Sequence, residues 1–106
     1  MRDSVGAGAD PRERCWTLYV LRCSDGSLYT GIATDVRRRL DEHQRGVRGA
    51  KYLRGRGPLR LLLQHPVGDR GRASRAESLV KRLPKERKER LVAVPRELTA
   101  LLDGLQ

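Results

Sequence analysis

Two short runs of strand-forming residues on either side of a turn signal constrain the fold of this chain most. Residues 16–23 (WTLYVLRC) and 28–33 (LYTGIA) are rich in aromatic, aliphatic and β-branched side chains, which favour strands. The turn between them, residues 24–27 (SDGS), contains a glycine, the residue that most readily takes the positive φ of a tight turn. The sequence therefore predicts a β-hairpin.

A helix, a loop and a third strand are expected to follow this hairpin. Thr34 or Asp35 can cap a helix that runs to about residue 45 and stops at Gly46, because side-chain oxygens cap helix starts and glycine suits helix ends. A glycine- and arginine-rich loop covers 46–58. Residues 59–65 (LRLLLQH) form a nearly continuous apolar run, which indicates a strand buried on both faces and hence central in the sheet.

The second half of the chain is expected to be helical. A helix over about residues 72–83 has a buried stripe, and Pro84 can begin the next helix, where a missing N–H costs nothing. The stripe consists of Ala73, Ala76, Val80 and Leu83. Pro95 is expected to end that helix and begin a short C-terminal one. The predicted order is β-β-α-β-α-α, an α/β (α+β) fold with a small three-stranded sheet covered by helices.

Composition suggests one folded domain with a tail. Residues 1–14 contain glycine, proline and charged residues with hardly any large aliphatic side chain, so we expect a disordered tail. The folded domain is predicted over 15–94, and the short C-terminal helix over 95–106. With 106 residues, the chain has room for one modest core.

The charge of the chain points to a polyanionic partner. Lys and Arg number 23 against 13 Asp and Glu, a formal net charge of +10, and nucleic acid is the simplest partner for such a protein. No run approaches the roughly 18 apolar residues of a membrane span, and no secretory signal is recognisable. Cys15 and Cys23 lie too far apart on one strand for a disulfide. These features predict a cytoplasmic protein without a membrane partner and with reduced cysteines.

A few polar residues stand out because they lie on or beside buried positions. Each has an ordinary structural explanation. A strand tyrosine is usually a core or edge residue, polar helix residues can line a wet margin, and Glu77 with Lys81 could be a surface pair of little consequence. The residues are Tyr19 and Tyr29 in the hairpin, Arg39 and His43 one turn apart on the first helix, and Glu77 on the second.

Taken together, these residues meet a known pattern. The segment 18–46 (LYVLRCSDGSLYTGIATDVRRRLDEHQRG) resembles the GIY-YIG nuclease motif, with Tyr19 closing its first tripeptide and Tyr29 opening the second. Arg39 follows Tyr29 at the expected ten-residue interval, and Glu77 falls on the acidic helix position of the family. The resemblance covers about 16–93 and is to the small, free-standing bacterial members.

This resemblance implies a fold and an activity. Members have a three-stranded antiparallel sheet flanked by helices and hydrolyse phosphodiester bonds with a divalent metal ion. By correspondence, Tyr19 and Tyr29 are the motif tyrosines, one of which orients or deprotonates the attacking water. Arg39 is the motif arginine, Glu77 the single carboxylate for Mg²⁺ or Mn²⁺, and His43 a residue near the scissile phosphate.

The residues themselves leave the general base open. A free tyrosine has a pKa near 10 and is a poor base at neutral pH, although a nearby cation would favour its ionised form. His43, with an unperturbed pKa near 6.5, competes for the role. Tyr19, Tyr29 and His43 therefore all stay candidates.

Two positions depart from the family pattern. Thr17 and Leu18 replace the first Gly-Ile pair, which a strand tolerates. Ile32 stands where some members carry a lysine directly after the second motif glycine. If that lysine helps to shape the nucleophile, its absence lowers the expected efficiency of cleavage, although free-standing members often lack it too.

Basic and aromatic residues after the first helix are candidates for nucleic-acid binding. Lys51, Arg54 and Arg56 could follow a phosphate backbone and Tyr52 could stack on an exposed base. Lys81 is a further candidate cation. The alternative is a solvated loop in which Tyr52 simply anchors the chain.

The expected function is metal-dependent endonucleolytic cleavage of DNA, structure-specific or weakly specific, with DNA repair or recombination as its setting. The alternative is a catalytically weak or inactive nucleic-acid-binding module of the same fold. Since one small domain carries no separate targeting domain, recognition is expected from DNA shape, the basic loop or a partner protein. The expected state is a monomer or weak dimer.

Overall fold

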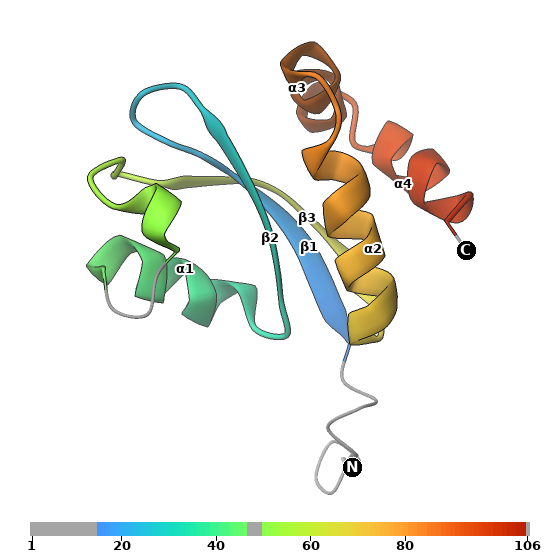
Figure 1. Cartoon of the computed structure of the whole chain (residues 1–106), viewed down its shortest axis with the longest axis horizontal. Helices are drawn as coiled ribbons and strands as arrows, with labels where there is room; N and C mark the ends of the chain where they lie inside the picture. The colour runs from blue at the N-terminus through green and yellow to red at the C-terminus, as the bar shows by residue number, and fades with distance from the viewer. Residues whose placement is uncertain (1–14, 47–49, 106) are drawn as a thin grey trace, which may run out of the picture.

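Among the described residues, the fold consists of three strands and four α-helices, with one short 3₁₀ helix (Figure 1). A computed structural model describes residues 15–46 and 50–105, and the predicted disordered tail, residues 1–14, lies outside the described residues. In chain order the elements are β1 (Trp16–Arg22), β2 (Leu28–Ala33), α1 (Val36–Arg45), η2 (Lys51–Leu53), β3 (Arg60–Gly68), α2 (Arg70–Lys81), α3 (Lys85–Ala93) and α4 (Arg96–Asp103).

The strands form one antiparallel sheet in the order β2-β1-β3. The β1–β2 hairpin pairs Tyr19 with Gly31 and Leu21 with Tyr29. Helices α2, α3 and α4 lie to one side of the strands in Figure 1, and α1 with η2 to the other. This confirms the predicted α+β class and the antiparallel three-stranded sheet flanked by helices.

The prediction that the third strand is central was wrong. The strand β1 pairs with both neighbours, whereas β3 pairs with β1 alone and forms an edge of the sheet. The strand also continues beyond residue 65 to Gly68. Pro66 lies inside it, and proline is tolerated in an edge strand because the N–H that it lacks can face solvent.

Alternating side chains of β1 supply both sides of the core. Leu18 and Val20 pack in one buried cluster with residues of α2, α3 and α4. Tyr19 and Leu21 pack in a second cluster with residues of α1, η2 and the adjoining loop. Because successive strand side chains point to opposite faces, this alternation places Tyr19 on the α1 side of the sheet.

Side-chain caps set the starts of the two site-bearing helices. The Asp35 carboxylate accepts from the backbone N–H of Arg38, and Gly46 ends α1 with φ 74°, as the sequence predicts. Helix α2 begins earlier than predicted, at residue 70, because the Asp69 side chain caps it by accepting from the N–H of Arg72. Each helix start is thus fixed by one aspartate.

The C-terminal helix belongs to the main core. Leu98 and Leu102 of α4 are almost fully buried in the cluster that covers one face of the sheet. The Arg72 guanidinium donates to the carbonyl oxygens of Leu102 and Leu105, at 3.0 and 3.3 Å. It thereby ties the C-terminal end of α4 to the start of α2. In the described part of the chain, no helix has the length and apolar character needed to cross a membrane.

Candidate active site

The centre of the candidate site is Tyr19, whose phenol ring lies directly over Gly31. These residues are paired across β1 and β2, and Tyr19 is 1% exposed. A Cβ atom on residue 31 would lie 2.5 Å from the Tyr19 hydroxyl oxygen, closer than real Cβ contacts allow. Glycine at position 31 is therefore required by the close approach of the Tyr19 ring.

A chain of hydrogen bonds joins Tyr19 to the loop after α1 through His43. The Tyr19 hydroxyl lies 2.9 Å from His43 Nε2, and the backbone N–H of Ala50 donates to His43 Nδ1 at 3.1 Å. Since a backbone N–H can only donate, Nδ1 carries no proton. In neutral imidazole the proton must then lie on Nε2, so His43 donates to the oxygen of Tyr19.

This arrangement bears on which group can act as a base. Burial, and next the Arg39 guanidinium, lower the pKa of His43, against the opposing effect of Glu42. The ring is therefore neutral at neutral pH, with one nitrogen accepting from the backbone and the other already protonated. In this conformation, His43 has no nitrogen with which to take a proton from water.

Two opposing influences act on the Tyr19 phenol. Burial and the neighbouring Tyr29 raise the pKa of Tyr19 well above its usual value, and the Glu77 carboxylate adds a smaller effect in the same direction. The charge of Arg39 and its hydrogen bond to the phenol oppose these effects and lower the pKa. Tyr19 is thus a phenol in the free protein, with donors in place that would favour the ionised form.

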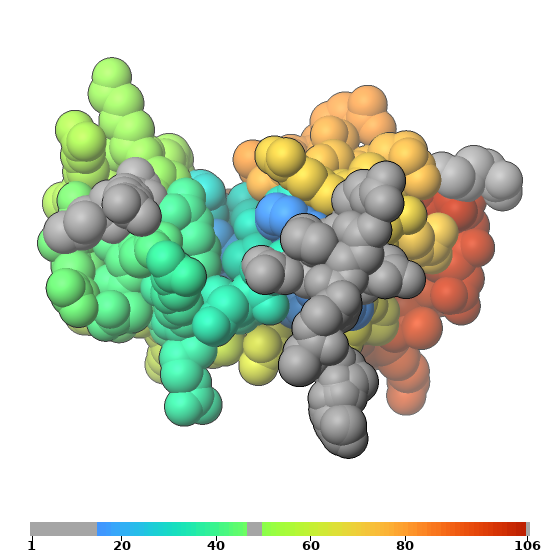
Figure 2. Space-filling model, turned by 90° about the horizontal axis from the view of Figure 1, so that it is seen from below, coloured from blue at the N-terminus to red at the C-terminus, as the bar shows by residue number. Residues whose placement is uncertain are grey.

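Tyr29 forms the second half of an aromatic cluster. Its ring centroid lies 6.3 Å from that of Tyr19 and 5.5 Å from that of His43. The Tyr52 ring stacks on the Tyr29 ring, with their centroids 6.1 Å apart. The Lys81 ammonium lies 6.0 Å from the Tyr29 ring centroid. Figure 2 shows the segments that carry these last two residues, η2 (light green) and α2 (yellow to orange), as separate projections.

Glu77 and Lys81 form the single-turn pair that their spacing predicts. The Lys81 ammonium lies 3.2 Å from the Glu77 carboxylate, which is 24% exposed. A cation already binds this half-buried carboxylate, so the position suits positive charge. Within residues 15–46 and 50–105, no group of three or more His, Cys, Asp or Glu side chains gathers closely enough to hold a metal ion.

A single carboxylate is compatible with one divalent ion. Mg²⁺ keeps several of its waters and commonly takes one or two protein carboxylates together with substrate phosphate oxygens. Glu77 would supply the protein ligand in such a site. The donor set of this chain therefore fits a weakly held magnesium or manganese ion better than a structural metal centre.

The loop residues proposed for nucleic-acid binding divide into two groups. The Arg56 guanidinium is paired with Asp25 of the hairpin turn, lies 4.2 Å from the Tyr52 ring centroid and donates to the Tyr52 carbonyl oxygen. It holds the loop against the hairpin. Lys51 and Arg54 are exposed on and just after η2, where they can reach a phosphate backbone.

Two residues that contribute to the site, Glu42 and Ala50, were not predicted from the sequence. Glu42 pairs with Arg39 at 3.1 Å, and its three-residue spacing on one helix could have revealed it. Ala50 contributes only a backbone N–H to His43, and no side-chain pattern marks such a group. The structure thus brings Tyr19, Tyr29, Arg39, His43 and Tyr52 into one connected cluster bordered by Glu77 and Lys81.

Residues 15–90 match the GIY-YIG catalytic domain family, and the chain belongs to this family of nucleases. It is 55% identical over 91 residues to the UPF0213 protein YhbQ of Escherichia coli (strain K12), covering 86% of this chain and 90% of that one. The YhbQ protein of Shigella boydii serotype 18 shows the same identity and coverage.

A solved structure supports the fold at lower identity. The solution NMR structure of the UPF0213 protein BH0048 from Bacillus halodurans is 45% identical in sequence to this chain. It matches with a TM-score of 0.50 and covers 80% of this chain and 93% of that one. These relatives are small proteins similar to this one over most of their length.

Proposed function

We propose that this protein is a metal-dependent endonuclease that hydrolyses phosphodiester bonds in DNA, with structural or weak sequence preference, in DNA repair or recombination. The observation that carries the proposal is the connected cluster around Tyr19. The cluster supplies a buried phenol over Gly31, a His43 N–H that donates to its oxygen, the charge of Arg39 acting on the phenol, and a carboxylate that fits a divalent ion. The net charge of +10 supports an anionic substrate.

In the proposed reaction, Tyr19 is the general base that accepts a proton from the attacking water. Tyr19 first releases its own proton to solvent, and the water oxygen then attacks phosphorus as its proton passes to the Tyr19 oxygen. The bond from phosphorus to one sugar oxygen breaks, and that oxygen takes a proton from solvent water. Once ionised, the Tyr19 oxygen accepts from His43 and Arg39 and keeps a lone pair for the water proton. Because burial raises the pKa of Tyr19, we expect the cleavage rate to rise with pH through the neutral and alkaline range.

The other residues stabilise the negative charge that develops on the phosphate. Phosphodiester hydrolysis spreads negative charge over the non-bridging oxygens, and Arg39 presents a permanent planar set of donors to them. A divalent ion held by Glu77 would act as a Lewis acid on the phosphate and its leaving oxygen. Lys81, exposed Lys51 and Arg54 are proposed to contact neighbouring phosphates.

Cleavage assays with branched, flapped, nicked and single-stranded DNA, and matched RNA, test the proposal. The protein should cut DNA only with Mg²⁺ or Mn²⁺, and Glu77→Gln and Tyr19→Phe should each remove most activity. Glu86→Gln, the same change at an exposed position of α3, serves as control. Cleavage that persists unchanged in EDTA or in Glu77→Gln would contradict the mechanism.

A separate measurement examines the role of Tyr19. Replacing it with 3-fluorotyrosine, whose phenol is more acidic, should move the pH–rate profile toward lower pH. An unmoved profile would remove Tyr19 as the base. Tight, salt-sensitive binding without cleavage across all substrates and metals would favour the alternative of a binding module.

A further inference from the structure

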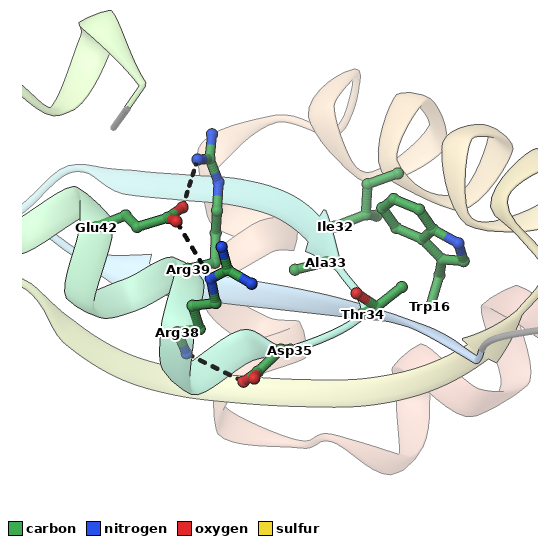
Figure 3. Close-up of a pocket in the computed structure, with 8 residues that line it drawn as sticks. All are labelled: Trp16, Ile32, Ala33, Thr34, Asp35, Arg38, Arg39 and Glu42. Atoms are coloured by element: carbon green, nitrogen blue, oxygen red, sulfur yellow. Dashed lines mark hydrogen bonds and ion pairs between the residues drawn. The ribbon is translucent and has the colours of Figure 1, made fainter. Parts of the chain in front are cut away.

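A cleft of about 400 Å³ opens beside the candidate active site, which is within the roughly 300–1,000 Å³ usual for ligand pockets. It lies between the start of β1, the end of β2 and the start of α1 (Figure 3). Trp16 and Ile32 face Arg38, Arg39 and Glu42 across it, with the segment Ala33–Asp35 between them.

The cleft is continuous with the catalytic cluster. Arg39 lines it, and the charge of its guanidinium also acts on the Tyr19 phenol and lowers its pKa. Ile32, on the opposite wall, directly follows Gly31, but its side chain packs with the cluster on the other face of the sheet. The cleft therefore opens around the β2 edge of the sheet and reaches the Tyr19 side through Arg39. A ligand in the cleft would therefore lie next to a substrate phosphate bound at Tyr19 and Arg39.

The charge of the cleft does not favour a phosphate. Glu42 pairs with both lining arginines, at 3.4 Å to Arg38 and 3.1 Å to Arg39. Asp35 also lines the cleft, so among the described residues that line it two arginines and two carboxylates cancel in formal charge. A neutral cleft with an indole on one wall suits a flat, uncharged heterocycle.

The indole of Trp16 is held in position from outside the cleft. The ring is half-buried, and the Arg70 guanidinium at the start of α2 lies 5.4 Å from its centroid. Arg70 is not among the residues that line the cleft. Trp16 is thus a preorganised stacking surface, and stacking on aromatic side chains is how proteins commonly hold unpaired bases.

We propose that this cleft binds the unpaired base of a nucleotide next to the cleaved phosphate, stacked on Trp16. The inference rests on the proposed function, which places that phosphate at Tyr19 and Arg39. A base in intact duplex must leave its stack to enter, and this costs least where the strand is already single. The cleft therefore selects flaps, single strands and nicked or frayed ends over intact duplex.

Trp16 is the only tryptophan of the chain, so its fluorescence reports on the cleft alone. Glu77→Gln protein is titrated with flapped, single-stranded, nicked and intact duplex DNA, while the anisotropy of a labelled DNA reports binding. Flapped and single-stranded DNA should quench the fluorescence. Intact duplex should bind with little quenching. Abasic substitution at one position beside the cleavage site should remove the quenching.

Substitutions of Trp16 test the stacking separately. Trp16→Ala should weaken binding to flapped DNA about 5- to 150-fold, the effect of losing one stacked base, with a much smaller change for duplex. Trp16→Phe, which keeps a stacking ring, should recover most of the affinity, and circular dichroism checks that both variants fold. Binding without quenching, quenching insensitive to every abasic position, or equal loss for flap and duplex would overturn the inference.

The outcomes separate this inference from the proposed function. A protein that quenches and discriminates as described but cuts nothing would keep the base-binding cleft and lose the nuclease proposal. A protein that cuts with a divalent ion but shows no quenching would keep the nuclease proposal and lose the cleft.

Discussion

At the scale of single residues, the site depends on residue 31 being a glycine, which has no side chain. The Tyr19 ring occupies the space where residue 31 would carry a Cβ atom, and Tyr19 is itself buried among core residues. Neither residue can move without disturbing the sheet. The hydroxyl is therefore placed by packing, and its hydrogen bonds only refine that placement.

Gly31→Ala is expected to abolish cleavage while leaving DNA binding largely intact. The new methyl group would displace the Tyr19 hydroxyl, and a misplacement of about 1 Å can cost roughly 100-fold in rate. Single-turnover cleavage and DNA-binding anisotropy measure the two effects. Gly71→Ala, whose Cβ would make ordinary contacts in the first turn of α2, is the control. Near-normal cleavage by Gly31→Ala would contradict the placement argument.

His43 is expected to make the fold sensitive to mild acid. Burial lowers its folded-state pKa below the usual 6.5, so the unfolded chain binds the proton more tightly. The contribution of neutral His43 to stability is therefore present above about pH 6.5 and lost as pH falls through the folded pKa. Protonation of Nδ1 would also break the hydrogen bond from Ala50.

Urea unfolding at a series of pH values measures this effect. Wild-type protein should lose stability relative to His43→Gln as the pH falls below about 6.5, because glutamine can accept from Ala50 but does not titrate. A difference between the two proteins that stays constant over this range would show that His43 titration is not linked to folding.

At the scale of elements, α2 brings a carboxylate and its counter-ion to the edge of the aromatic cluster. Lys81 pairs with Glu77 one turn away and lies near Tyr29. A divalent ion that binds Glu77 must therefore compete with a resident ammonium group. This competition is a second reason, beyond the single carboxylate, to expect weak metal binding by the free protein.

Lys81→Met should strengthen metal binding by the free protein. Removing the competing ammonium is expected to improve the affinity for Mn²⁺ roughly two- to fivefold, the scale of a partly exposed ion pair. Electron paramagnetic resonance of free Mn²⁺ measures this without DNA or turnover. Lys85→Met, at an exposed position of α3, provides the matched control, and weaker Mn²⁺ binding by Lys81→Met would refute the competition.

Local signals predicted the elements better than their arrangement. The hairpin, the Asp35 and Gly46 caps and the helix after Pro95 all rest on nearby residues, and the structure confirms them. The central strand is the one that pairs with a neighbour on both sides. Residues 16–23 and 59–65 are both apolar enough for that position. Packing decided it, because only β1 is buried continuously, from Leu18 to Leu21.

The candidate site was also predicted only in part, for the same physical reason. Motif spacing predicted which residues would gather around Tyr19. It did not predict that Ala50 would fix the tautomer of His43, because a backbone N–H from a loop leaves no mark in the sequence. It also did not predict that Arg56 would hold Tyr52 and Asp25 together, since those contacts join segments far apart in the chain.

At the scale of the whole molecule, the C-terminal helix contributes to the stability of the GIY-YIG domain. Leu98 is fully buried, and the Arg90–Glu97 ion pair adds a link from α3 to α4. The Arg22–Glu89 pair connects β1 to α3. The strand that carries Tyr19 is thereby supported by the last helices of the chain.

Leu98→Ala should destabilise the protein by about 2–5 kcal/mol, the usual cost of a leucine truncated in a core. That is a large part of the roughly 5–15 kcal/mol available to a small domain. Urea unfolding checks it. Thr99→Ala, exposed on the same helix, should change stability by about 0.5 kcal/mol or less. Equal effects would mean that α4 is dispensable for the core.

The close packing of Tyr19 over Gly31 also has an evolutionary consequence. Every glycine codon lies a single nucleotide change away from an alanine codon. One such mutation at position 31 is expected to disable the proposed cleavage yet leave exposed Lys51 and Arg54 and the Trp16 cleft in place. A lineage of this fold could therefore pass from nuclease to nucleic-acid-binding protein in one step, and an alanine at this position would identify relatives that have done so.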